Sequence, residues 1–236
     1  QQSTATEFGF VDLATGAVSW QDGPGEKSYP MASSPTRNFW AGVAMRGGLL
    51  SFDVQDTTTG EWSRLEVPLD TWPDILAKAR SDKAWVGGAS MVGESLFAII
   101  YSTDEGGALL RIDPATGEAT RVFDGWAAEM TIGPDAVAWV PFTDPRHALV
   151  LTDAQSPRVV DVMPAERCLV RQLDVRNGRL AVGIYCGEGR PGEVDVFDDH
   201  GAPIVSLPTS EKDWATGRAL GLTDGSLILL HGQGEH

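Results

Sequence analysis

Short apolar or alternating runs, separated by turn residues, cover most of the chain. In the clearest stretch, residues 84–124, the runs read AWVGGASMV, SLFAIIYST, ALLRIDP and EATRVFD. Glycine-containing turn signals separate them: Gly93 with Glu94, the cluster at residues 105–107, and the Thr-Gly at 116–117. Runs that alternate with a period of two and end at turn residues predict strands. This stretch therefore predicts four antiparallel strands joined by tight turns.

The chain repeats one phrase several times. FGFVDLATGAVSWQDG from residue 8 matches LLRIDPATGEATRVFDG from residue 109, and weaker copies start at residues 49, 149 and 193. The glycine that four of the five copies carry in the turn can supply the positive φ that a tight hairpin needs. One aspartate anchors each copy, and the gaps between anchors are 41, 60, 40 and 45 residues; the anchors are Asp12, Asp53, Asp113, Asp153 and Asp198. A period near 40–45 residues with several strands per unit indicates propeller blades.

The two ends of the chain each hold half a unit. EFGFVDL and AVSWQD open the chain, whereas GRALGLT and SLILLHG close it. These four runs predict one shared blade that closes the ring, which protects edge strands from pairing with other chains. The predicted fold is all-β: a single domain over residues 1–236 forming a five-bladed β-propeller of four-stranded antiparallel blades. The blades span approximately residues 30–68, 84–124, 126–163 and 167–207, with 214–232 and 5–22 sharing the last. A β-sandwich and a six-bladed ring are the alternatives.

The phrase RIDPATGEATRV resembles the strand–turn–strand wording of bacterial propeller repeats of the YVTN, PQQ-like and TolB-like kind. The resemblance covers all five units loosely. It implies a fold more than a function, since those families include binding scaffolds, lyases, lactonases and dehydrogenases. The tryptophan-docking pattern of quinoproteins and the calcium ligands of lactonases are not recognisable here, so the resemblance does not extend to those two activities.

The 60-residue gap contains an inter-blade insertion at residues 69–83. Within it, PLDTWPDILAKARSDKA predicts a short helix with Pro73 near its start and Thr71 or Asp70 as its cap. Ile75, Leu76 and Ala79 would share one face. The segment also carries Trp72, a candidate ligand contact. It is expected to act as a lid or partner handle, or to be a surface loop folded onto itself.

The charge balance restricts the partners. The chain has 18 basic and 33 acidic side chains, a net charge of −15. Such a chain repels phosphate backbones, so neither nucleic acid nor an anionic membrane surface is an expected partner. No apolar run approaches the roughly 18 residues that span a bilayer. The opening QQSTATEF lacks a signal peptide's basic and apolar regions, which suits a mature secreted protein or a trimmed chain.

Cys168 and Cys186 flank the turn VRNGR in consecutive predicted strands. With a three-residue loop of residues 176–178, Val175 faces Arg179 and the two cysteines lie directly opposite, within disulfide reach. A two-residue Asn-Gly turn would shift the register by one and separate them. The pair predicts a disulfide and an oxidising compartment: a secreted, periplasmic or cell-surface protein, or the soluble part of an anchored one. The alternative is two buried, reduced thiols.

The loops that enter the inner strands carry the candidate ligand contacts. Three of them place a tryptophan at a similar position, and a fourth offers Tyr29. The aromatic residues are expected either to form a rim that stacks on a ligand or to pack between blades. Four charged residues lie just inside this position. The tryptophans are Trp85, Trp126 and Trp214, and the charged residues are Glu129, Arg167, Arg171 and Arg218.

Chemistry beyond binding is weakly indicated. Glu129 beside an arginine could be an ordering ion pair or an acid/base group, and no second carboxylate appears at a matching depth. The four histidines are scattered without ligand spacing, so no metal or cofactor is expected. The sequence thus predicts a non-catalytic extracytoplasmic module that binds a protein or glycan through its loop face. The alternative is an extracellular hydrolase or lyase acting on a carbohydrate or lactone.

Overall fold

The computed structural model describes residues 7–11, 15–22, 28–42, 45, 48–104, 106–152, 157–162, 168–186, 192–209, 219–223 and 225–230. Four antiparallel sheets of four strands account for most of it. The first is β3 (Ser28–Ser33), β4 (Arg37–Gly42), β5 (Leu49–Asp56) and β6 (Trp62–Pro68); the second is β7 (Ala84–Val92), β8 (Ser95–Ser102), β9 (Gly106–Ile112) and β10 (Ala119–Arg121). The third is β11 (Ala127–Ile132), β12 (Val137–Pro141), β13 (His147–Leu151) and β14 (Arg158–Asp161); the fourth is β15 (Leu169–Arg176), β16 (Arg179–Tyr185), β17 (Gly192–Phe197) and β18 (Pro203–Thr209).

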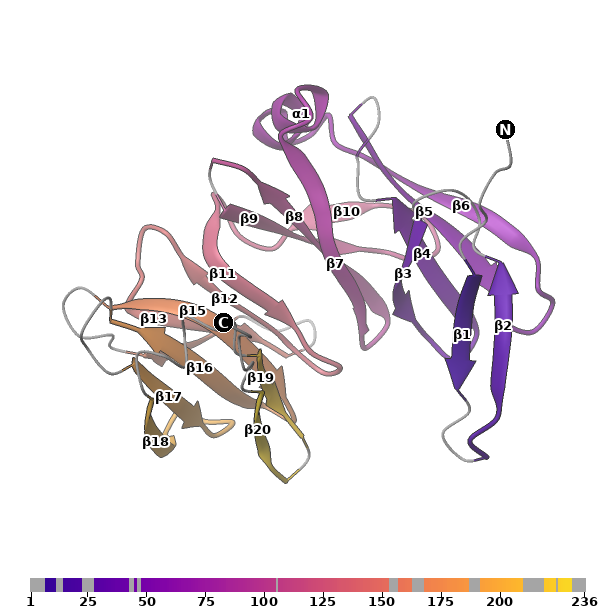
Figure 1. The fold of residues 1–236 in the computed structure, drawn as a ribbon. Coiled ribbons are helices and arrows are strands. Elements are labelled where there is room, and N and C mark those ends of the chain that lie inside the picture. Colours follow the sequence, from indigo (N-terminus) through magenta and orange to yellow (C-terminus); the bar gives the residue numbers. More distant parts are fainter. Residues whose placement is uncertain are drawn as a thin grey trace, which may run out of the picture.

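The sheets follow one another around an arc (Figure 1). Their first strands, β3, β7, β11 and β15, contact one another in that order, so they form the inner side of the arc. A single residue pair, Ala127 with Gly107, also joins the second and third sheets. The end of the sheets where these inner strands begin is called the entry end below. Because neighbouring strands are antiparallel, the turns after β5, β9 and β17 lie at the opposite end, called the turn end.

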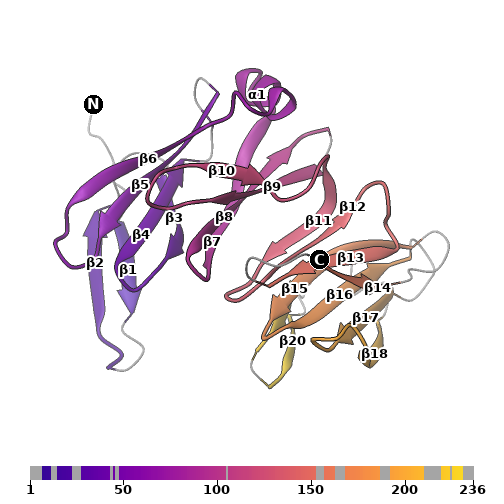
Figure 2. The same cartoon turned by 180° about the vertical axis from the view of Figure 1, so that it is seen from behind.

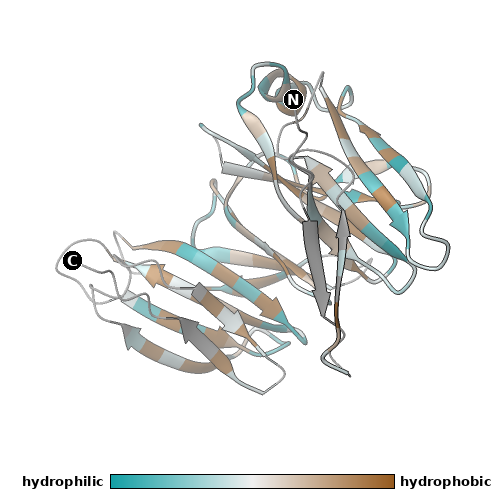
Figure 3. Ribbon diagram, turned by 45° about the vertical axis from the view of Figure 1, so that its right-hand side comes forward, coloured by the Kyte–Doolittle hydropathy of each residue, from teal (hydrophilic) through white to brown (hydrophobic). Residues whose placement is uncertain are grey.

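Each interface between neighbouring sheets has its own apolar core. In β8, Leu96, Ala98 and Ile100 point into the core shared with the first sheet, whereas Phe97 and Ile99 point into the core shared with the third. A further core joins the third and fourth sheets. Figure 3 shows apolar and polar residues alternating along several strands. The central strands are thus buried on both faces, which explains why SLFAIIYS reads as a continuous apolar run.

The terminal strands correct one prediction. Among the residues that the structure describes, β1 (Glu7–Val11) pairs only with β2 (Val18–Asp22), and β19 (Ala219–Leu222) pairs only with β20 (Leu227–Leu230). The two hairpins lie at different ends of the arc in both views (Figures 1 and 2). The predicted closing blade therefore does not form in this structure. The ladder hydrogen bonds of each hairpin are internal, but β19 also packs on β15 and β16 through Leu220 and Leu222, and the Leu222 N–H donates a hydrogen bond to the Asp174 carboxylate of β15.

The insertion forms a helix, α1 (Pro73–Arg80), as predicted. Pro73 occupies its first turn, and Ile75 and Ala79 are buried in the first core with Leu76 packed against it. The predicted cap at Thr71 or Asp70 is wrong: the cap position is Trp72, whose side chain makes no capping hydrogen bond. The helix starts one residue later because the Leu76 N–H donates to the Trp72 carbonyl.

The repeated aspartates close the turns at the turn end. The Asp113 carboxylate accepts a hydrogen bond from the Ala115 N–H at 2.7 Å, and the Gly117 N–H donates to the Asp113 carbonyl. Asp56 and Asp198 make equivalent bonds in their own turns. Hydrogen bonds from backbone N–H groups hold the pKa of all three carboxyls below its ordinary value. The repeated phrase is therefore a self-capped hairpin turn.

This geometry corrects the anchor of the second copy. The residue equivalent to Asp113 is Asp56, since both have the same bonds to a glycine four residues later. Asp53 lies in the middle of β5 and pairs with Arg64 at 3.0 Å. Asp12 and Asp153 lie outside the described residues. The stacked antiparallel sheets and recurring turns are those of a β-propeller fold.

Candidate functional site

Every inner strand of the four sheets carries a β-bulge near its start. The register shifts at Met31 in β3, Gly87 in β7, Ala128 in β11 and Arg171 in β15. A bulge bends its strand and re-aims the neighbouring side chains. Four bulges at matching positions therefore give the entry end a common backbone geometry.

The residues around these bulges differ from sheet to sheet. The residue two positions before the bulge is aromatic in three of the inner strands and leucine in the fourth. The residue one position after the bulge is small in two strands, acidic in one and an amide in one. The first set is Tyr29, Trp85, Trp126 and Leu169; the second is Ala32, Gly88, Glu129 and Gln172. Tyr29 and Leu169 are 44% and 50% exposed. Open space lies over Gly88, where no atom would approach an added Cβ within 4 Å.

Glu129 is half-buried at this end of β11. Burial raises its pKa to about 7, and the positive charge of Arg171 on β15 opposes that rise. No hydrogen bond or ion pair joins the Glu129 side chain to another described residue. The carboxyl is therefore available to a ligand, and near neutral pH both its protonated and its ionised forms are populated.

Tyr101 on β8 is a site residue that the sequence analysis missed. Burial and then the negative charge of Glu129 raise the pKa of its phenol. Its ring lies 6.0 Å from that of Trp85, centroid to centroid. An added Cβ would approach the ring within 2.1 Å at Gly87 and within 3.2 Å at Gly107. Tyr101 thus occupies a slot between two glycines, and the glycine pattern was the only sequence signal for it.

The other predicted tryptophans take different roles. Trp126 packs against the first core and lies 5.6 Å from the guanidinium of Arg121, which in turn pairs with Asp74 of α1 at 2.9 Å. Trp72 also packs against that core. Both therefore support the packing interpretation, whereas Trp85 belongs to no buried cluster of the described residues. Arg167, Trp214 and Arg218 lie outside the described residues.

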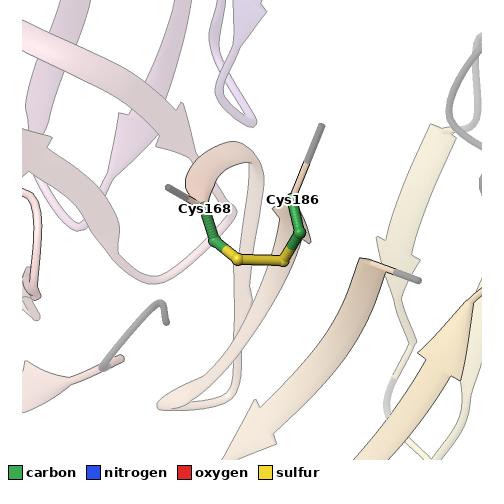
Figure 4. The surroundings of a disulfide bond; sticks show 2 residues. All are labelled: Cys168 and Cys186. Carbon is green, nitrogen blue, oxygen red and sulfur yellow. A yellow bond between two sulfur atoms is a disulfide. The ribbon is translucent and has the colours of Figure 1, made fainter. Parts of the chain in front are cut away.

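The predicted disulfide between Cys168 and Cys186 is present, with a Cα–Cα distance of 3.9 Å (Figure 4). The turn behind it is the two-residue one: Arg176 faces Arg179, and Asn177 and Gly178 both have positive φ. This corrects the predicted three-residue loop. The bulge at Arg171 shifts the register by one, so Leu169 faces Tyr185 and the cysteines meet despite the shorter turn. The disulfide thereby ties down the strand that presents Arg171.

The described residues contain no cluster of three or more potential metal ligands. They also contain no helix with the length and hydropathy that a bilayer crossing requires. The side chains described around Glu129 at the entry end are therefore its carboxyl, the guanidinium of Arg171, the phenol of Tyr101 and the Trp85 indole, with the phenol of Tyr29 exposed on the neighbouring strand β3. Such a set can stack on a ring and exchange hydrogen bonds with hydroxyl or amide groups.

No sequence family and no curated protein matches the chain. Solved structures do match. A prolyl endopeptidase aligns with a TM-score of 0.59 at 13% identity over 87% of this chain and 32% of its own. An oligogalacturonate lyase in complex with manganese aligns with a TM-score of 0.52 at 14% identity, over 86% of this chain and 60% of its own. TolB from Acinetobacter baumannii aligns with a TM-score of 0.48 at 15% identity, over 85% of this chain and 48% of its own.

The first two similarities support the propeller fold and identify no repeat family at these identities. The chain spans about a third to three fifths of the length of those two proteins. At 13% and 14% identity the two similarities show the fold alone, and a fold by itself favours neither binding nor catalysis.

Proposed function

We propose that the protein is an extracytoplasmic binding module that recognises a glycan at the entry end of its inner strands. The observation that carries the proposal is the combination of four matching bulges with four different sets of side chains. A purely structural repeat has no need to vary the residues that its backbone presents. Variation on a repeated backbone is what a ligand of irregular shape requires.

The chemistry at this end suits a sugar. The Trp85 ring provides aromatic surface for the apolar face of a pyranose and is backed by Tyr101, which itself packs against the core between the second and third sheets. The Glu129 carboxyl and Arg171 guanidinium provide hydrogen-bonding partners for hydroxyl groups. The proposed extracytoplasmic location is supported by the disulfide, which persists in oxidising compartments. A protein segment is the runner-up ligand, since the same side chains bind peptides.

A screen of defined oligosaccharides tests this proposal. Cello-, xylo- and chito-oligosaccharides and oligogalacturonides are titrated into the wild type by calorimetry. For the probe that binds, Trp85→Ala is expected to weaken affinity by about tenfold or more, because stacked aromatic contacts dominate such sites. Trp62→Ala is the matched control, since Trp62 is a partly exposed tryptophan on the outermost strand of the first sheet. If Trp85→Ala and Trp62→Ala bind the oligosaccharide with equal affinity, the proposal that Trp85 belongs to the binding site is wrong.

Catalysis is the second candidate, favoured by one observation. A carboxyl whose pKa is raised to about 7 by burial is suited to act as a general acid at neutral pH. The described residues around it offer a phenol and a guanidinium but no second carboxylate. Glu129→Gln distinguishes the two: a hydrolase or lyase loses turnover of a bound oligosaccharide while retaining affinity, whereas a binding module has no turnover to lose.

A further inference from the structure

A long groove of about 1430 Å³ lies between the first and second sheets. On one side it is lined by Glu66 and Pro68 of β6 and by residues 70–72 before α1; on the other, by Arg111, the 113–118 turn and β10. Residues 70–72 lie where β7 begins, whereas the 93–95 and 113–118 turns lie at the turn end. The groove therefore runs from one end of the sheets to the other. Its volume exceeds the range of about 300–1,000 Å³ typical of small-molecule pockets.

The walls of this groove are strongly acidic. Five carboxylates line it, and none forms an ion pair with a described residue; they are Glu66, Asp70, Glu94, Asp113 and Glu118. Arg111 is the one cation among the described residues that line the groove, and its Nε already donates to the Ser95 Oγ at 2.9 Å. Neighbouring carboxylates without ionic partners repel one another and attract a cation. The charge of the groove is thus complementary to a basic ligand.

Two further features suit an extended chain. β6 and β10 are the outermost strands of their sheets, so each has one edge without a strand partner among the described residues. An extended segment between such edges can use main-chain hydrogen bonds for affinity. Trp72 lines the groove beside Asp70 and is half-buried, which leaves part of its indole surface for an aliphatic stem or a cation.

The position of the two walls is fixed by specific contacts. The guanidinium of Arg37 in β4 donates to the Pro114 carbonyl at 3.0 Å. At Gly117 an added Cβ would lie 2.3 Å from the Glu66 carbonyl oxygen, so the turn approaches β6 closely. Arg121 pairs with Asp74 at 2.9 Å and fastens α1 to β10. A groove held at three points is preformed, which reduces the ordering cost of binding.

We propose that this groove binds an extended lysine- or arginine-rich segment of a partner protein. The proposal is independent of the glycan site, because the groove lies along the outer strands of the first and second sheets and shares no lining residue with the cluster around Glu129.

The test measures fluorescence anisotropy of a labelled peptide of alternating lysine and serine at low salt. The groove variant is Glu66→Gln, Glu94→Gln and Glu118→Gln together; all three side chains are exposed, so the fold is expected to tolerate the changes. The matched control is Glu61→Gln, Asp124→Asn and Asp199→Asn, which removes the same charge from exposed positions outside the groove. Circular dichroism confirms that both variants are folded.

The groove variant is expected to weaken peptide binding by about tenfold, and the control by less than about threefold. Equal weakening in both variants would show attraction to the overall negative charge and would overturn the proposal. Failure of the lysine–serine peptide to bind, or equal binding of a glutamate–serine peptide, would also overturn it. Oligosaccharide binding is expected to be the same in the groove variant and the wild type. The proposal for the groove and the proposal for the glycan site can therefore be refuted independently.

Discussion

The turn end and the entry end of the sheets repeat in different ways. At the turn end, Asp56, Asp113 and Asp198 each accept a hydrogen bond from the backbone N–H two residues later, in the first, second and fourth sheets, so both the residue and the geometry recur. At the entry end the bulge recurs, but the residues after it are Ala32, Gly88, Glu129 and Gln172. Recurring chemistry indicates a structural task performed once per sheet. Different chemistry on a recurring backbone indicates recognition.

The largest effect is expected from removing the disulfide at the entry end. Cys168→Ser with Cys186→Ser should destabilise the protein by about 3 kcal/mol, because the bond joins residues 18 apart in the sequence and so restricts the unfolded chain. Chemical denaturation measures the change. The β1–β2 hairpin, far from the bond, should retain its amide exchange rates in the same variant. An unchanged unfolding midpoint would mean that β15 is held in place without the bond.

Two glycines at the turn end provide the next largest effect. Gly60 and Gly117 occupy equivalent turns with φ of 76° and 78°, but only Gly117 has a carbonyl oxygen of the neighbouring sheet against it. Gly60→Ala should cost about 1 kcal/mol from the positive φ alone. Gly117→Ala should cost about 2 kcal/mol more, since the turn must also move away from Glu66. Thermal unfolding of the two variants measures the losses. Equal losses of stability would show that the contact between the 113–118 turn and β6 contributes nothing.

Glu129 gives the entry end a pH dependence of stability near neutral pH, where the turn aspartates have none. Its folded pKa is raised to about 7 from 4.5, so its contribution to stability is complete below pH 4.5 and is lost as the pH rises through about 7. The wild type should lose about 1–2 kcal/mol between pH 5 and pH 8, a value reduced for partial exposure. Glu129→Gln should flatten this slope. A slope that persists in the variant would assign the titration to another group.

The turn aspartates give the smallest effect, with the opposite sign. Their folded pKa lies below 3.8, so the stability they add is present above that pH and is lost as the pH falls through the lower value. Asp113→Ala should therefore lower the thermal midpoint at neutral pH and have little effect in strong acid. The variant and the wild type are compared by thermal unfolding across that range. A loss that is independent of pH would show that the carboxylate charge contributes nothing.

The sequence predicted the parts of the fold that depend on local patterns. The alternating runs and turn signals predicted the strands of all four sheets, and Pro73 with Ile75 and Ala79 predicted α1. Ring closure was not predictable in this way, because pairing between the terminal hairpins is a long-range property with no local signal. The bulges were missed for a related reason: at Met31 and Ala128 no glycine marks them, and register is visible only once two strands are paired.

In the candidate site, too, residues with a local sequence signal could be predicted and residues placed by tertiary packing could not. Glu129 and Trp85 could be proposed from their place before or within predicted inner strands. Tyr101 could not, since it lies on the second strand of its sheet and reaches the site only because Gly87 and Gly107 leave room for its ring. The disulfide prediction was confirmed although its predicted turn was wrong, because the bulge at Arg171 compensated for the shorter turn.

The most direct test of the account is an NMR titration of the ¹⁵N-labelled protein with the oligosaccharide set. The account predicts that the binding oligosaccharide shifts the indole N–H signal of Trp85 and the backbone signals around Gly88, Glu129 and Arg171. The signals of Gly60, Gly117 and Gly201 at the turn end should not move. Shifts confined to the turn end, or no shift with any of the oligosaccharides, would contradict the claim that the entry end is the recognition site.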